Sequence, residues 1–270
     1  MAPFNQPLRS GVLLVGHGTR DAEGTAATFE LAALVQKELD PLPVETCFLE
    51  ITQPNIEQGI ARLVNRGACQ ITALPLMLFA AGHVKQDIPA ATRQAIGRHP
   101  NVSVQVLPHL GSHGAILQLS ADRYRSAVDE SAISTRLVLV GRGSRDAEAI
   151  AEMHRFAEQR AELTPVEELD VCFLAMAEPK LAEGLARAAA SQAQRIVVQP
   201  HLLFPGELLA KVRSEVHAFA QRYPQQWIVA PPLGVDRLIV EAITQLAQSE
   251  AKSFSGVRWP ILKLPTRSPV

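Results

Sequence analysis

The chain contains one internal repeat, and this repeat constrains the fold more than any other feature of the sequence. Residues 14–23 read LVGHGTRDAE, and residues 139–148 read LVGRGSRDAE. Further segments keep the same order behind it, and Cys47-Phe48-Leu49 corresponds to Cys172-Phe173-Leu174. A spacing near 125 residues is far longer than the ~20–50-residue period of solenoid proteins. The repeat therefore predicts two copies of one globular domain.

Each copy alternates apolar strands with amphipathic helices. In the first copy, the predicted strands cover residues 12–15, 46–49, 71–76 and 102–107. The predicted helices include Leu31 and Val35, run from Pro54 to about Asn65, and start again at Asp87. This order predicts an α/β fold in which each copy is a parallel sheet with helices on both faces. We expect domains at residues 1–128 and 129–250, followed by a loosely packed tail at 251–270.

The composition fits this organisation and argues against several classes of partner. The 270 residues are 47% hydrophobic, which is enough for two cores, and the net charge of −1 provides no large basic field for nucleic acid. No run of eighteen apolar residues predicts a membrane span, and residues 1–10 lack the apolar core of a signal peptide, so we expect a cytoplasmic protein. Cys47, Cys69 and Cys172 form no CxxC motif and are expected to be thiols, neither disulfide-bonded nor iron–sulfur ligands.

Three polar residues at strand ends distinguish the first copy from the second. His17, Glu50 and His83 each close a strand or lie in the loop after it, and the second copy has Arg142, Ala175 and Glu207 instead. The carboxyl ends of parallel strands meet at one edge of the sheet, where α/β proteins bind ligands. Two imidazoles and one carboxylate are suitable ligands for Co²⁺, Ni²⁺, Fe²⁺ or Zn²⁺. Drift after duplication could explain each change, but the loss of all three favours a chemical role in the first copy.

The glycine-flanked turn itself is shared by both copies. Such a turn before a helix could bind phosphate, but a nucleotide site lacks support because the turn has neither G-x-x-x-x-G-K-[ST] nor G-x-G-x-x-G. We interpret the shared residues as architecture, with Asp21 and Asp146 as helix-capping acids.

The remaining histidines fall into three groups. His109 and His113 lie near the end of the fourth predicted strand and could line the same cleft. His201 follows a strand at the position of Leu76 and is expected to be a core or edge histidine. Solvated positions account for the others, which are His99, His154 and His217.

Taken together, these motifs resemble those of the sirohydrochlorin chelatases, type II chelatases of the lyase class that insert cobalt or ferrous iron into a tetrapyrrole of cobalamin and siroheme biosynthesis. The matching segments are residues 13–20, Phe48-Leu49-Glu50 with Pro54, and residues 75–84, PLMLFAAGHV. The resemblance covers nearly the whole chain, because the family includes long forms whose second half is a degenerate copy of the first. It implies two chelatase-like domains, of which the first is active.

The resemblance also implies roles for individual residues. His17 and His83 would hold the metal, His17 would accept pyrrole protons, and Glu50 would assist as ligand or proton acceptor. The tetrapyrrole would contact Glu50 and a loop made of Leu78, Phe79, Ala80, Ala81, Gly82 and His83, and Lys85 would face its carboxylates. Some long members carry a His-rich stretch or an iron–sulfur cysteine motif, and this chain has neither.

Several alternatives remain open at this point. The physiological metal could be cobalt, iron or nickel, and the protein could be a metal or tetrapyrrole carrier without turnover. We expect the divalent metal to be a substrate, with no cofactor permanently bound. We also expect a monomer, because two fused halves can form within one chain the interface of a homodimer.

Overall fold

The computed structural model describes residues 10–79, 82–111, 113–129, 133–164 and 166–251. The first half contains β1 (Ser10–Gly16), α1 (Ala22–Leu39), β2 (Val44–Phe48), α2 (Ile56–Asn65), β3 (Gln70–Pro75), the π-helix η1 (His83–Asp87), α3 (Ile88–Ile96), β4 (Ser103–Val106) and α4 (Gly114–Ala127). The second half contains β5 (Thr135–Gly141), α5 (Ala147–Leu163), β6 (Glu168–Phe173), α6 (Leu181–Ala189), β7 (Arg195–Pro200), α7 (Glu207–Ala220), β8 (Gln226–Val229) and α8 (Arg237–Ala251). The predicted tail lies almost entirely outside the described residues.

Each half contains a four-stranded parallel sheet, as the sequence predicts. The strand orders are β2-β1-β3-β4 and β6-β5-β7-β8, so the two sheets have the same topology. Val15 pairs with Cys47 and Pro75, and Val140 pairs with Cys172 and Pro200. The predicted α/β fold is therefore confirmed for both copies.

The central strand of the first sheet is buried on both faces, which explains its continuous apolar run. Leu13 and Val15 face the core beneath α2 and α3, whereas Val12 and Leu14 face the core beneath α1. All four side chains are fully buried.

Local capping determines where the helices begin. The Asp21 carboxylate accepts a hydrogen bond from the Gly24 backbone N–H at 2.8 Å, and the Asp146 carboxylate accepts one from Glu148 at 3.0 Å. Both aspartates are therefore helix caps, as predicted. The helix predicted from Pro54 begins two residues later, at Ile56, because Asn55 and Gln58 form a reciprocal capping box. The helix predicted from Asp87 becomes α3 with η1 in front of it.

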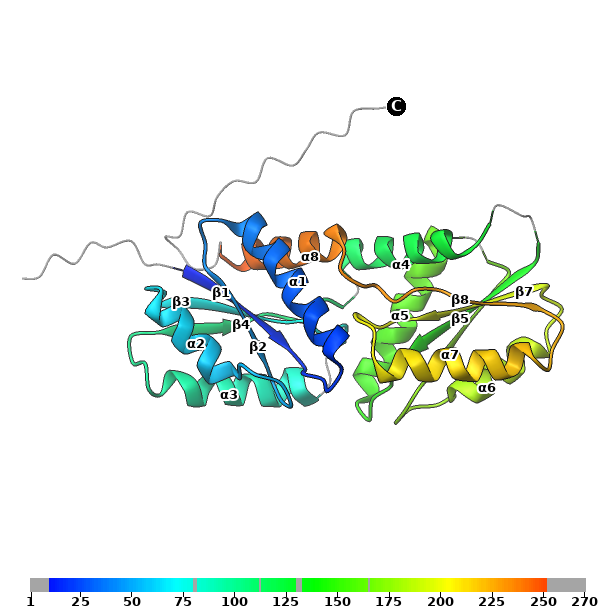
Figure 1. Ribbon diagram of the computed structural model, residues 1–270, viewed down its shortest axis with the longest axis horizontal. Coiled ribbons are helices and arrows are strands. Elements are labelled where there is room, and N and C mark those ends of the chain that lie inside the picture. Colours follow the sequence, from blue (N-terminus) through cyan, green and yellow to red (C-terminus); the bar gives the residue numbers. More distant parts are fainter. Residues whose placement is uncertain (1–9, 80–81, 112, 130–132, 165, 252–270) are drawn as a thin grey trace, which may run out of the picture.

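The last helix of each half packs on the sheet of the other half (Figure 1). Helix α8 contacts α1 and β3 of the first half, whereas α4 contacts α5 of the second half. Leu119 of α4 belongs to the same core as Phe156 of α5, and Ile243 of α8 shares that core with Leu31 of α1. The apolar core is therefore continuous across both halves.

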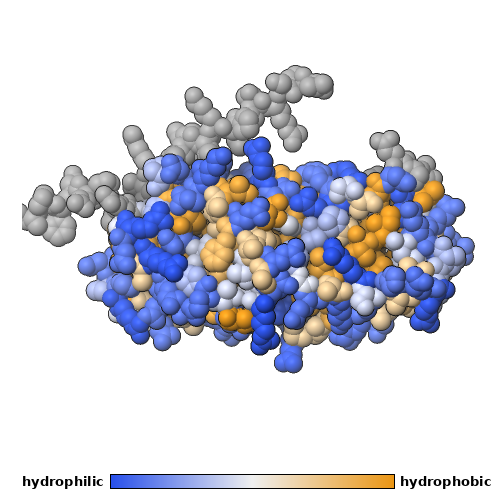
Figure 2. Space-filling view, in the orientation of Figure 1, coloured by the Kyte–Doolittle hydropathy of each residue, from blue (hydrophilic) through white to orange (hydrophobic). Residues whose placement is uncertain are grey.

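The cysteines and the surface agree with the composition. Cys47 and Cys172 are buried thiols outside any disulfide, and burial raises the pKa of Cys172 to about 12. On the face in Figure 2, hydrophilic residues predominate and hydrophobic residues form small patches. Within the described ranges, none of the helices combines the length and the apolar character that crossing a membrane requires.

Candidate functional site at the carboxyl edge of the first sheet

The first sheet brings His17 and Glu50 together at its carboxyl edge. His17 follows β1, Glu50 follows the neighbouring strand β2, and the backbone N–H of Glu50 donates a hydrogen bond to the His17 carbonyl at 3.1 Å. The strand ladder therefore continues past the strands and sets the distance between the two residues.

Their side chains form a close pair near the surface. His17 Nδ1 lies 3.2 Å from Glu50 Oε1, and the two side chains are 25% and 48% exposed. A carboxylate beside Nδ1 favours a proton on that nitrogen, so that Nε2 carries the lone pair, and a neutral imidazole in this form can bind a metal ion or a proton. The pair thus has the chemistry of a histidine ligand oriented by a carboxylate.

Thr52 links the two loops that carry this pair, and the sequence analysis missed it. Its hydroxyl accepts a hydrogen bond from the Thr19 N–H at 3.1 Å and donates one to the Thr19 carbonyl at 2.9 Å. Gly18 lies between these loops with a φ of 99°, and a side chain there would overlap the carbonyl of Glu50. The one available signal was that Ala177, without a hydroxyl, replaces Thr52 in the second copy.

The second half keeps this backbone arrangement without its functional groups. The Ala175 N–H donates to the Arg142 carbonyl at 3.0 Å, as Glu50 does to His17 at 3.1 Å. Gly143 adopts a φ of 88°, close to that of Gly18. The scaffold is therefore common to both halves, and only the first half combines an imidazole and a carboxylate on it.

The loop after β3 borders the same edge. The Leu76 N–H bonds to the Val15 carbonyl at 2.9 Å, so the loop starts beside β1. Leu78 and Phe79 are half-buried, Gly82 is exposed, and the backbone of His83 begins η1. Ala80 and Ala81, which the sequence analysis assigned to the substrate pocket, lie outside the described residues.

Lys85 has acidic partners within the protein. Its Nζ lies 2.7 Å from Asp146 Oδ2 and 2.7 Å from Glu148 Oε2, at the start of α5 in the second half. Hydrogen bonds to these carboxylates raise the pKa of Lys85, and the bond from Lys85 lowers the pKa of Asp146. Any carboxylate of a substrate would compete with them for the ammonium group.

His109 and His113 make different contacts. His109 Nε2 lies 3.4 Å from Glu152 Oε2 on α5, so His109 is part of the interface between the halves. Burial lowers the pKa of His109, while Glu152 acts in the opposite direction. His113 caps α4, because its Nδ1 accepts a hydrogen bond from the Ala115 N–H at 3.2 Å. This contact gives His113 a structural role.

His201 is a core residue, as predicted. It is 3% exposed, and its ring lies 4.1 Å from the ring of Phe156 and 5.2 Å from that of Phe79. Burial among these rings lowers the pKa of His201 to about 3.

His17 and Glu50 could both donate to a metal ion at the carboxyl edge. Among the side chains that the structure describes, no three His, Cys, Asp or Glu residues are grouped closely enough to hold one ion. His17 and Glu50 provide two donors, and sites that leave metal coordination positions open suit ligand exchange better than closed four-ligand sites.

Known proteins share both the sequence and the fold. The chain is 33% identical over 252 residues to the sirohydrochlorin ferrochelatase of Priestia megaterium, which covers 92% of this chain and 94% of that relative. It is 31% identical over 216 residues to the sirohydrochlorin cobaltochelatase of the same organism, over 78% of this chain and 70% of the relative. Both alignments extend across the two halves.

Solved structures show the same architecture. SirB from Bacillus subtilis with Fe³⁺ aligns with a TM-score of 0.83 and 24% identity, over 91% of this chain and 98% of that one. SirB in complex with cobalt aligns with a TM-score of 0.78 and 25% identity, over 91% and 96%. The CbiX family model matches twice, at residues 11–127 and 136–250. Since these two matches span nearly all of both repeated halves, the chain is a member of the CbiX family.

Proposed function

We propose that this protein is a sirohydrochlorin chelatase that inserts a divalent metal, cobalt or ferrous iron, into the tetrapyrrole at the carboxyl edge of its first sheet. One observation carries the assignment of the site: His17 and Glu50 form a close pair on a loop scaffold whose copy in the second half has Arg142 and Ala175 instead. The named relatives, sirohydrochlorin ferrochelatase and cobaltochelatase, support the substrate and the reaction.

The reaction requires both a loosely held metal and a proton acceptor. Insertion of M²⁺ forms bonds from the metal to the pyrrole nitrogens and releases two N–H protons. Imidazole has an unperturbed pKa of about 6.5, so it can bind the metal or take a proton near neutral pH. In this proposal His17 Nε2 performs both tasks in turn, while the Glu50 carboxylate keeps the ring oriented and stabilises the imidazolium.

His83 is the second metal ligand in this proposal, and Leu78 to His83 line the tetrapyrrole. Support for this comes from the position of the loop, which leaves β3 next to the strand that carries His17. The metal is a substrate and leaves within the product, so no cofactor needs to stay bound. We further propose a monomer, which light scattering would test, and a cytoplasmic location, which cell fractionation would test.

The first experiment follows the visible absorbance of anaerobic sirohydrochlorin with the purified protein and either Co²⁺ or Fe²⁺. We expect insertion faster than the uncatalysed rate, and we expect His17→Ala to abolish most of the acceleration. Arg142→Ala is the matched control, since Arg142 is exposed at the corresponding position of the second half. Metal binding without acceleration would instead identify a carrier.

A further inference from the structure

Two contacts with the second half flank the loop that ends at His83. Phe79 packs against rings of the second half, and Lys85 forms ion pairs with it. We propose that the second half positions the turn that carries His83, and that Lys85 is a positioning residue for metal insertion. This inference rests on the proposed function, because it assigns a task to the second half, which has Arg142 and Ala175 in place of His17 and Glu50.

The first contact is an aromatic seat for Phe79. The Phe79 ring lies 6.3 Å from Phe156, edge to face, and 5.2 Å from His201. Phe156 and His201 are almost completely buried, so this seat belongs to the rigid core of the second half. The first half has aliphatic Leu31 and Leu76 at the corresponding positions. The aromatic seat, formed by Phe156 and His201, is therefore a feature of the second half, where it contacts Phe79 of the first half.

The second contact places the Lys85 ammonium against the start of α5. Its Nζ is 2.7 Å from both Asp146 Oδ2 and Glu148 Oε2. The other oxygen of Asp146 caps α5, so this carboxylate is fixed by the helix before Lys85 reaches it. Leu209 replaces Lys85 in the second half, and the capping Asp21 of the first half lies beside Gly206. The first half therefore reaches the second through this ion pair, whereas the second half has no lysine at the corresponding position to reach the first.

The location of Lys85 explains why such a contact matters for the reaction. Exposed ion pairs contribute little to stability. Lys85 is, however, two residues from His83 within the same short π-helix, so its anchor limits the movement of that turn. A misplacement of about 1 Å can slow a reaction about 100-fold. The contact is therefore expected to affect geometry far more than folding.

Kinetics of the Lys85→Met and Glu148→Gln variants separate positioning from direct substrate binding. Each variant should lower kcat for insertion about five-fold with less than about a two-fold change in KM, because the turn is displaced before the metal transfer. The double variant should lose no more than the stronger single variant, since both break one contact. Glu23→Gln is the matched control, as Glu23 occupies the corresponding position on α1 and should leave kcat unchanged.

A second readout uses Co²⁺ alone and does not depend on turnover. We expect Lys85→Met and Glu148→Gln to change the visible absorption of bound Co²⁺ and to weaken its binding about three-fold, whereas Glu23→Gln should match the wild type. An increase in KM for Lys85→Met, with Glu148→Gln behaving as wild type, would show that Lys85 binds substrate and would overturn the inference. Wild-type kcat and Co²⁺ spectra in both variants would overturn it as well. A wild-type protein without insertion activity would refute the proposed function, and the Co²⁺ spectra would still test the positioning.

Discussion

Helices α4 and α8 occupy corresponding places in the two halves, but they meet their sheets through different chemistry. Where α8 covers the first sheet, four matched positions are apolar, namely Val35, Leu74, Ile243 and Ala247. Where α4 covers the second sheet, the corresponding positions are occupied by Arg160, Gln199, Ser120 and Tyr124. We call the contact of α8 with the first sheet, around Val35 and Ile243, the aliphatic seam, and the contact of α4 with the second sheet, around Arg160 and Ser120, the polar seam.

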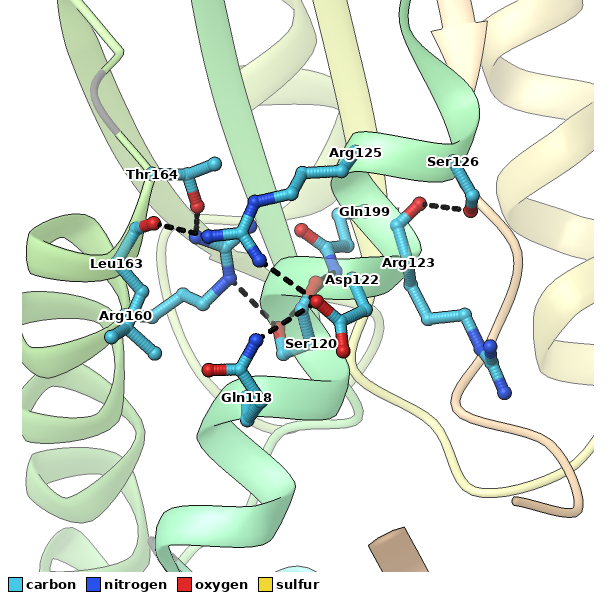
Figure 3. A network of polar contacts seen from close by, with 10 residues as sticks. All are labelled: Gln118, Ser120, Asp122, Arg123, Arg125, Ser126, Arg160, Leu163, Thr164 and Gln199. Carbon is cyan, nitrogen blue, oxygen red and sulfur yellow. Dashed lines mark hydrogen bonds and ion pairs between the residues drawn. The ribbon is translucent and has the colours of Figure 1, made fainter. Parts of the chain in front are cut away.

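The polar seam is a connected network (Figure 3). The Arg160 Nε donates a hydrogen bond to Ser120 Oγ at 3.1 Å, and Gln199 Nε2 donates to the Ser120 carbonyl at 2.7 Å. Arg160 also bonds to Thr164, and its guanidinium lies 5.5 Å from the centre of the Tyr124 ring. Burial lowers the pKa of Arg160 to about 10. This side chain is fully buried, and α4 supplies one of its hydrogen-bond acceptors, Ser120 Oγ.

This contrast explains how two similar halves keep their last helices on the correct sheets. If α8 covered the second sheet, Arg160 and Gln199 would face Ile243 and Ala247, which offer no polar side chain. An unsatisfied buried polar group costs about 1–3 kcal/mol, and more when it is charged. The polar seam thus disfavours the wrong pairing more than it stabilises the right one.

The largest expected effect comes from giving the first half the residue of the second. His17→Arg should slow metal insertion at least about 100-fold, because an arginine neither coordinates a metal nor accepts a proton near neutral pH. Initial rates with Co²⁺ and sirohydrochlorin provide the measurement. Arg142→His in the second half should leave the rate unchanged, and equal losses in the two variants would contradict a single active half.

The seam itself can be broken at its centre. Ser120→Ala removes the hydroxyl that accepts a hydrogen bond from Arg160, and we expect the free energy of unfolding to decrease by about 1–3 kcal/mol. Ile243→Val at the matched position of the aliphatic seam should cost about 0.5–1.5 kcal/mol. Urea titration monitored by circular dichroism measures both values, and a smaller loss for Ser120→Ala than for Ile243→Val would contradict the importance of the network.

A third comparison concerns His201 and its aliphatic counterpart Leu76. The unfolded chain binds a proton below about pH 6.5, whereas the folded protein, with a pKa of about 3 for His201, does not. The free energy of unfolding should therefore decrease by up to about 1.4 kcal/mol for each unit by which the pH falls between pH 6.5 and 3. His201→Leu should remove this part of the pH dependence, because Phe79 and Phe156, the rings against His201, do not titrate. Parallel stability curves for the two proteins would refute the assignment.

A smaller effect on the rate than that of His17→Arg is expected for Glu50, whose place is taken by Ala175 in the second half. Glu50→Gln keeps the shape of the side chain but removes its charge, so we expect insertion to slow about 10-fold. Tetrapyrrole binding, measured by fluorescence quenching, should change less than the rate. Glu178→Gln, on the surface of the second half, is the control. An unchanged insertion rate for Glu50→Gln would remove Glu50 from the mechanism.

Local sequence patterns were sufficient to predict the two sheets and the proximity of His17 and Glu50. Apolar runs such as residues 12–15 identify buried strands, and parallel strands place their carboxyl ends together, so the proximity of His17 and Glu50 could be predicted. Asp21 and Asp146 could be assigned as caps because capping depends only on residues within one turn. The internal repeat then indicated which polar residues the fold itself does not require.

The way in which the two halves interlock depends on contacts that exist only in the folded chain. The exchange of α4 and α8, the Arg160 network, the aromatic seat of Phe79 and the ion pairs of Lys85 all join segments far apart in the chain. Helical periodicity shows that a helix has an apolar face, but not which of two similar sheets that face will cover. Hydrogen-bond satisfaction and close packing make that choice, and both are properties of the folded partners together.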